Sequence, residues 1–207
     1  MALTTFNPRS FDLSDTYAFT GTVSGTNVGG GSLVKISEQT ASASDSISFT
    51  SGIDSTYRTY YFKFINIHGS STAQFRFNAS TDSGSNYNVT KTTTFFNALT
   101  SEGDVFGGFG YETARDLAQS TGFQILSATG GSDADQTSSG TLTLFNPAST
   151  TYVKHFISRF NNSTFDNYTW DSHIAGYGNT TSAINAIRFQ MSSGNIDAGT
   201  IHMYGIA

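Results

Sequence analysis

The sequence predicts an all-β protein, and three observations lead to this fold class. First, the 207 residues include 30 Thr, 18 Phe and 10 Tyr, which are residue types that suit a pleated, half-buried surface. Second, the strong helix formers Ala, Glu, Lys and Leu are too few for a helical bundle. Third, short segments of alternating apolar and polar residues are separated by clusters of Gly, Asn, Asp and Ser, where sheet proteins turn.

Residues 1–31 differ from the rest, and we expect them to form an arm and linker ahead of a β domain at residues 32–207. Three consecutive glycines at positions 29–31 end this segment, and such a run makes a flexible connection. Large aromatic side chains are unfavourable to leave exposed, so we expect the arm to dock on a partner. A frayed terminus is the alternative. The predicted docking residues are Phe6, Phe11, Tyr17 and Phe19.

The period-two pattern predicts about ten strands after the arm. The segments are 33–36, 46–50, 57–65, 73–78, 90–96, 122–126, 141–145, 152–158, 186–191 and 200–206, with a weaker candidate at 168–175. On the longest, Tyr60, Phe62 and Phe64 share one face, which we assign to the core. The same pattern turns Phe75 and Phe77 inward.

The only helical candidate is the short segment from Glu112 to Gln119, which has little apolar face. Short antiparallel strands in a domain of this size are typical of two packed sheets. The sequence therefore predicts a two-sheet antiparallel sandwich with an extended N-terminal arm, and a jelly roll is the favoured arrangement.

Composition disfavours several classes of function. The absence of Cys excludes disulfide scaffolds, zinc ribbons and thiol nucleophiles. A net charge of −5 with only 10 Lys and Arg argues against binding to nucleic acid. No apolar run approaches the roughly 18 residues of a membrane span. The first nine residues lack the features of a signal peptide, so we expect synthesis in the cytoplasm or incorporation into a particle assembled there.

Candidate catalytic and metal-ligating residues do not form a recognisable constellation. Asp171 and His173 are two positions apart and could share a strand face, but one carboxylate and one imidazole leave a zinc shell half empty. Asp133 and Asp135 resemble half of a calcium loop that lacks its distal glutamate. The glycines at 107, 108 and 110 lack the Lys-Ser/Thr of a phosphate loop. We expect no catalytic residue, no metal and no cofactor.

Two aromatic residues suggest a binding surface. Trp170, the only tryptophan, lies two positions after Tyr168, so on a strand the two side chains would share a face. Together they could form a platform for a sugar ring, as aromatic faces do in binding sites. The alternative is that Trp170 is an ordinary core residue.

Four stretches of the chain are similar to proteins of one kind. These are residues 11–25, 51–68, 144–155 and 191–206. Together they resemble small structural proteins of marine tailed phages, of the cyanophage and pelagiphage type, over nearly the whole chain. The resemblance implies a virion protein, labelled as a capsid, tail or fibre component, and it implies no catalytic residues.

We therefore expect a non-enzymatic phage structural protein, found in the virion and attached through its arm as a capsid decoration or fibre-like protein. The alternative is a receptor-binding tail protein that binds a host surface carbohydrate. A polysaccharide depolymerase is a third class, but no residue in the sequence supports it.

The excess of aromatic residues also suggests a homo-oligomer. On the pattern above, Tyr57, Tyr61 and Phe156 fall on faces opposite the core set, and exposed aromatics mark partner surfaces. The resemblance favours a trimer, because phages tend to use three-fold sites and fibres. A monomer held only by its arm is the alternative.

Overall fold

The computed structural model describes residues 32–207. Segments in which apolar and polar residues alternate form almost all of its strands. The described residues contain twelve strands and no helix, and so no helix that could cross a membrane. The strands are β1 (Leu33–Thr40), β2 (Ile47–Phe49), β3 (Thr59–Gly69), β4 (Phe75–Ser80), β5 (Lys91–Ser101), β6 (Gly107–Tyr111), β7 (Gln124–Ile125), β8 (Ser138–Phe145), β9 (Lys154–Ser163), β10 (Tyr168–Gly178), β11 (Ala186–Met191) and β12 (Ile196–Ile206).

The strands form two antiparallel sheets, as the sequence predicts. The large sheet has eight strands in the order β1-β12-β3-β8-β9-β10-β5-β6, and the small sheet has four in the order β2-β11-β4-β7. The two-sheet sandwich is thereby confirmed, whereas the jelly roll stays a prediction.

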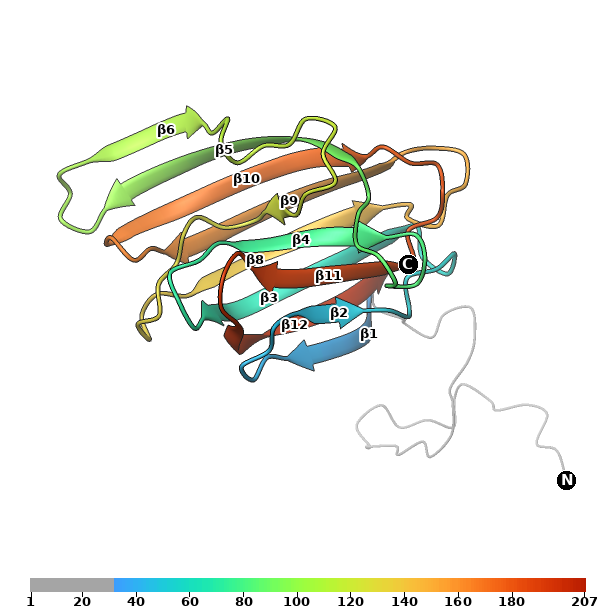
Figure 1. Cartoon of the computed structure of the whole chain (residues 1–207), viewed down its shortest axis with the longest axis horizontal. Helices are drawn as coiled ribbons and strands as arrows, with labels where there is room; N and C mark the ends of the chain where they lie inside the picture. The colour runs from blue at the N-terminus through green and yellow to red at the C-terminus, as the bar shows by residue number, and fades with distance from the viewer. Residues whose placement is uncertain (1–31) are drawn as a thin grey trace, which may run out of the picture. The chain divides into compact units, whose positions relative to one another are not determined.

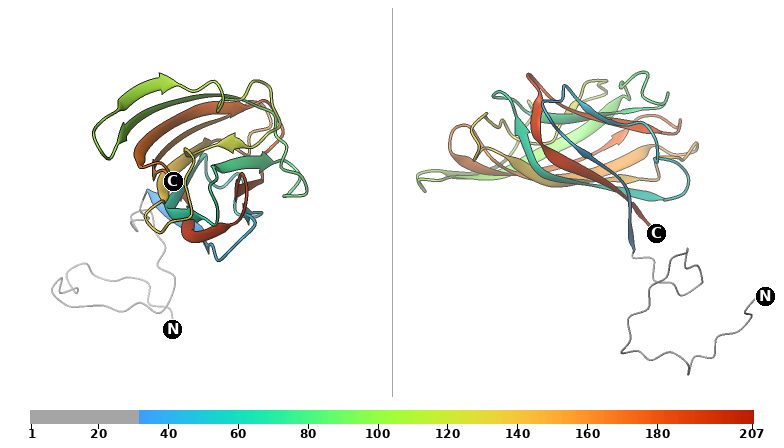
Figure 2. Two further views of the ribbon diagram at one scale, coloured as in Figure 1. Left: turned by 60° about the vertical axis from the view of Figure 1, so that its left-hand side comes forward. Right: turned by 90° about the horizontal axis from the view of Figure 1, so that it is seen from below.

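The two sheets differ in extent, and this difference positions the candidate site. The small sheet lies in front of the part of the large sheet from β12 to β9, and β10, β5 and β6 extend beyond it (Figure 1). Figure 2 shows the two layers from other directions, with the large sheet curving around the small one. We call the side of the large sheet that faces the small sheet its inner face, and the opposite side its outer face.

The core between the sheets is built mainly from phenylalanine rings. Phe64 of β3 lies with its ring centroid 5.0 Å from Phe189 of β11, 5.6 Å from Phe75 of β4 and 4.9 Å from Phe160 of β9. Tyr60, Phe62, Phe64, Phe75 and Phe77 are all buried. The inward faces that the sequence predicts for these two strands are therefore confirmed.

Two of the three predicted outward aromatic residues lie elsewhere. Phe156 is only 3% exposed and its ring packs 5.0 Å from that of Phe77, so the prediction of an outward Phe156 is wrong. Ile157 takes the outward position on β9, because alternation separates two faces without saying which is inside. Tyr57 precedes β3 and packs against the core, whereas Tyr61 does lie on the outer face, beside Tyr204.

The helical candidate from Glu112 to Gln119 does not form a helix. The segment makes one turn, in which the Arg115 amide donates to the Glu112 carbonyl, and then continues along the edge of β5. The Thr93 amide donates to the Leu117 carbonyl there, at 2.9 Å. A short helix is marginal by itself because nucleation is unfavourable, and pairing with the strand edge offers the same backbone groups better partners.

Candidate ligand-binding site around the first half of strand β10

The first half of β10 presents chemically different side chains on its two faces. Tyr168 and Trp170 lie on the inner face, and Thr169, Asp171 and His173 lie on the outer face, as strand alternation requires. This end of β10 is paired with β5 on one side and with β9 on the other. Both faces here belong to the part of the large sheet that extends beyond the small sheet (Figure 1).

The inner face carries an aromatic hollow of about 220 Å³. It is lined by Leu99, Phe106, Asp166, Tyr168 and Trp170. The exposed ring of Phe106 meets the ring of Tyr168 edge to face, with centroids 6.4 Å apart. The two residues that the sequence predicts as a platform therefore line one hollow, and Asp166 adds a carboxylate beside the rings.

Arg115 covers part of this aromatic surface. Its guanidinium carbon lies 4.9 Å from the centre of the Trp170 ring and 5.7 Å from that of Phe95. Burial lowers the pKa of Arg115 from its ordinary value. Because one face of the indole is occupied by this cation, Tyr168 and Phe106 provide the more accessible aromatic surface of the hollow.

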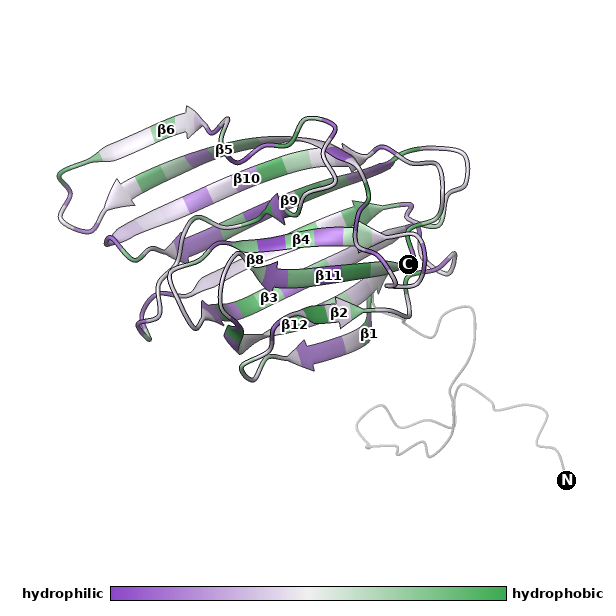
Figure 3. Ribbon diagram, viewed as in Figure 1, coloured by the Kyte–Doolittle hydropathy of each residue, from purple (hydrophilic) through white to green (hydrophobic). Residues whose placement is uncertain are grey.

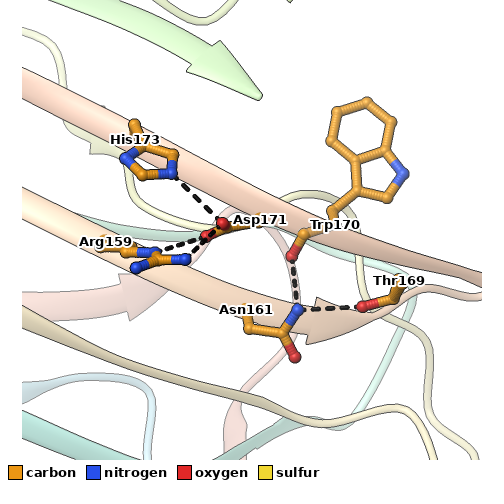
Figure 4. A network of polar contacts seen from close by, with 6 residues as sticks. All are labelled: Arg159, Asn161, Thr169, Trp170, Asp171 and His173. Atoms are coloured by element: carbon orange, nitrogen blue, oxygen red, sulfur yellow. Dashed lines mark hydrogen bonds and ion pairs between the residues drawn. The ribbon is translucent and has the colours of Figure 1, made fainter. Parts of the chain in front are cut away.

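The outer face carries a network of polar contacts, drawn in Figure 4. Arg159 of β9 donates two hydrogen bonds to the Asp171 carboxylate, from Nε at 2.8 Å and from Nη2 at 2.7 Å. The His173 Nε2 atom lies 3.2 Å from Oδ2 of the same carboxylate. Nearby, the Asn161 amide donates to the Thr169 hydroxyl at 2.9 Å and to the Trp170 carbonyl at 3.1 Å.

The network fixes the charge state of its carboxylate. The hydrogen bonds from Arg159 hold the pKa of Asp171 below its ordinary value, with a smaller contribution in the same direction from His173. The lowered pKa favours the ionised carboxylate, which accepts both hydrogen bonds from Arg159. The sequence predicts that Asp171 and His173 could share a face, and they do, but a guanidinium engages both carboxylate oxygens where a metal ion would bind.

Aromatic rings adjoin this network towards the edge of the sheet. The imidazole of His173 stacks on Phe96 of β5, with centroids 4.9 Å apart and planes inclined by 7°. The ring of Phe96 in turn meets that of Phe109 on β6 at 5.7 Å. An open hollow of about 390 Å³ lies on the other side of the network, beside Ser139 and Thr141 of β8.

The two faces are separate surfaces, and each is equipped for non-covalent recognition. The inner face offers aromatic rings and the Asp166 carboxylate, and the outer face offers hydroxyl, amide, carboxylate and guanidinium groups beside aromatic rings. Such groups match the hydrogen-bonding groups and the apolar faces of a hydroxyl-rich ligand. Within residues 32–207, no three His, Cys, Asp or Glu side chains come together as a metal site would require.

The other predicted residues are not part of this site. Phe6, Phe11, Tyr17 and Phe19 lie outside the described residues. Asp133 is in a turn, where its carboxylate lies 3.4 Å from the Gln136 side-chain amide. The sequence did not single out Arg115, Asn161, Arg159 or Phe96, because only strand pairing and a turn bring them next to β10.

Comparisons of the chain with protein-family models, curated proteins and solved structures give no match.

Proposed function

We propose that the protein is a non-enzymatic structural protein of a tailed-phage particle, in which residues 32–207 form a displayed β-sandwich and residues 1–31 attach it. The resemblance of the sequence to marine phage structural proteins motivates this role. A capsid decoration or a fibre-like protein is the form that the resemblance favours.

One observation in the described residues carries the proposal, namely an apolar patch on the outer face of the large sheet, beside the polar network. A sheet face that meets only water is ordinarily polar. Here Phe145 and Ile157 are exposed and line, with His155, Ala175 and Tyr177, an apolar groove of about 490 Å³. Apolar surface of this kind marks contact with other proteins, as expected of a subunit in an assembly.

The test is incorporation into particles. Tagged full-length chain and tagged residues 32–207 are each expressed during infection, and the particles are then purified on a density gradient. We expect the tag of the full-length chain in the particle band and that of the truncated chain outside it. Urea unfolding of the truncated chain is the control for its folding.

The two parts of the proposal fail in different ways. If the truncated chain enters particles at the occupancy of the full-length chain, residues 1–31 do not attach it. If neither chain is found with particles, the virion role is wrong.

The aromatic hollow favours a second candidate function, a carbohydrate-binding adhesin on the same particle. Stacking of a sugar ring on Tyr168 and Phe106, with hydrogen bonds to Asp166, would use the chemistry that the hollow presents. On an array of host-surface glycans, we expect binding by the natural chain to be lost in Tyr168→Ala and kept in Tyr152→Ala, which alters an exposed tyrosine outside the hollow. Equal binding by both variants would exclude the hollow as the glycan site.

A further inference from the structure

Strand β6 forms one edge of the large sheet, and its outer side has no partner strand in the part of the chain that the structure describes. One hydrogen bond to β5 lies just beyond each end of β6. The Ser101 amide donates to the Phe106 carbonyl at 2.8 Å, and the Glu112 amide donates to the Phe95 carbonyl at 2.9 Å. Hydrogen-bonded pairs alternate along an antiparallel ladder. The amides and carbonyls of Gly107, Phe109 and Tyr111 therefore point away from β5.

The opposite edge of the large sheet is built differently. β1 carries Lys35 and Glu38, which form an ion pair, and its pairing with β12 shifts register between Lys35 and Ser37. Charged side chains and bulges are the features by which proteins keep edge strands from pairing with another chain. The β1 edge has both of these protective features.

β6 has neither of them. Its five residues, Gly-Gly-Phe-Gly-Tyr, include no charge and no proline, and its pairing with β5 runs without a register shift. Phe109 is 76% exposed and Tyr111 is 52% exposed. In Figure 3, the purple that marks hydrophilic residues covers part of β1, whereas β6 is pale and green. An uncharged edge strand with exposed aromatic side chains is suited to pairing with another strand.

We propose that this edge is an interaction surface for a second copy of the chain, and that two β6 strands pair antiparallel across a two-fold axis. The strand is self-complementary about its central residue. With Phe109 opposite Phe109 of the second copy, Gly107 of each chain lies opposite Tyr111 of the other. These are the residues whose backbone groups are free, and each such pair exchanges two hydrogen bonds.

The side chains fit the same arrangement. The two Phe109 rings lie on the outer face as direct cross-strand neighbours, a pairing that stabilises sheets. Each Tyr111 ring faces Gly107, which has no side chain to obstruct it. No charges oppose each other along β6, so self-pairing meets no like-charge repulsion within the strand. A two-fold contact of this kind uses the same surface on both copies and closes at two chains.

This inference does not rest on the virion role or on glycan binding, since it follows from the edge alone. It also differs from the three-fold assembly that the resemblance favours, because one edge strand shared across a two-fold axis joins two copies. The mass of the assembly therefore distinguishes the two arrangements.

The experiment measures the mass of the full-length chain by light scattering over a micromolar concentration series. We expect twice the chain mass of 22.1 kDa for the natural protein. Phe109→Lys places like charges side by side at the axis, which disfavours pairing. We expect this variant to raise the dissociation constant of the dimer about tenfold or more. Tyr152→Lys is the matched control, since Tyr152 is an exposed aromatic residue that lies in the turn before β9, away from β6, and we expect it to remain dimeric.

Hydrogen exchange tests the backbone contact directly. The amides of Phe109 and Tyr111 are expected to become protected as concentration rises in the natural chain, and to stay unprotected in Phe109→Lys. Circular dichroism and urea unfolding show whether both variants are folded. A single-chain mass at every concentration, a three-chain mass, or a dimer lost in Tyr152→Lys but kept in Phe109→Lys would each overturn the proposal.

Discussion

The inner face of the large sheet has two regions that share one sequence pattern but have different surroundings. On β3, inward Phe62 and Phe64 meet rings of the small sheet and are fully buried. On β10, inward Tyr168 and Trp170 extend past the small sheet and line an open hollow with Arg115 nearby. An inward aromatic residue is therefore a core residue where the small sheet covers it and part of an open hollow where the small sheet does not. The covered region holds the fold together, and the uncovered region leaves aromatic surface accessible.

The strongest test of this difference is Phe62→Ala in the covered region. The Phe62 ring lies 5.7 Å from Phe49 and 5.6 Å from Phe189, with no exposed surface. Truncation removes these contacts and leaves a cavity, so we expect a loss of about 3–5 kcal/mol in the free energy of unfolding. Urea unfolding followed by fluorescence gives the value. A loss under about 1 kcal/mol would mean that this region does not hold the fold together.

Lys91 lies where the covered region meets β5, and it predicts a pH dependence. Its ammonium is buried and donates to Asn78 Oδ1 of β4 at 2.6 Å and to the Val89 carbonyl at 2.7 Å. Burial lowers the pKa of Lys91 from 10.5 to about 7. Between these values the unfolded chain holds the proton and the folded chain releases it, so the contribution of Lys91 to stability rises with pH in this window.

The variant Lys91→Met isolates this effect. From pH 7 to pH 9, we expect the natural chain to gain about 2 kcal/mol of unfolding free energy relative to Lys91→Met. Urea unfolding at the two pH values, with both proteins measured in the same buffers, gives the difference. If the two curves shift in parallel, Lys91 does not release its proton in the folded state.

In the uncovered region, Arg115 takes the place of the small sheet over Trp170 and Phe95. We expect Arg115→Ala to lower the unfolding free energy by about 1 kcal/mol, because it removes both the cation–π contacts and the packing of the side-chain stem. Arg115→Met keeps most of the packing without the charge. If the two variants are equally destabilised, the charge of Arg115 rather than the packing of its stem stabilises the fold. If Arg115→Ala is as stable as the natural chain, the turn that carries Arg115 does not support the hollow.

The smallest effect is expected on the outer face, at Ile157→Ala. Ile157 is 56% exposed, although it neighbours the buried Phe156 on the same strand. Exposed substitutions of this kind usually change stability by no more than about 0.5 kcal/mol. A loss above about 1 kcal/mol, measured by urea unfolding at low protein concentration, would indicate that the outer face is covered in the folded protein.

Much of the fold could be predicted because strand alternation is local. The inward positions of Tyr60, Phe62 and Phe64 follow from a period of two on a strand with a clearly apolar side. On β9 both alternating sets contain apolar residues, so the pattern could not decide between Phe156 and Ile157. β6 escaped prediction because its glycines are typical of a loop, and only pairing with β5 makes the segment a strand.

For the candidate site, the sequence predicted which residues of β10 share a face but not which residues surround them. The spacing of Tyr168 and Trp170 puts them on one face, and that of Asp171 and His173 puts them on the other. The partners of these residues come from β9, from β5 and from the turn after β6. Which residue of a neighbouring strand lies opposite depends on register, and register depends on contacts between distant segments.

The sequence by itself determined the all-β class, the two-sheet sandwich and the inward side of its most regular strands, because each follows from composition or from the local alternation of side chains. Only the tertiary structure decided that the large sheet extends past the small one. Hydrogen bonding between strands far apart in the chain sets the order of each sheet, and the packing of the phenylalanine rings sets which strands of the large sheet the small sheet covers. That arrangement leaves the aromatic hollow of β10 and the free edge of β6 open to a ligand and to a second chain.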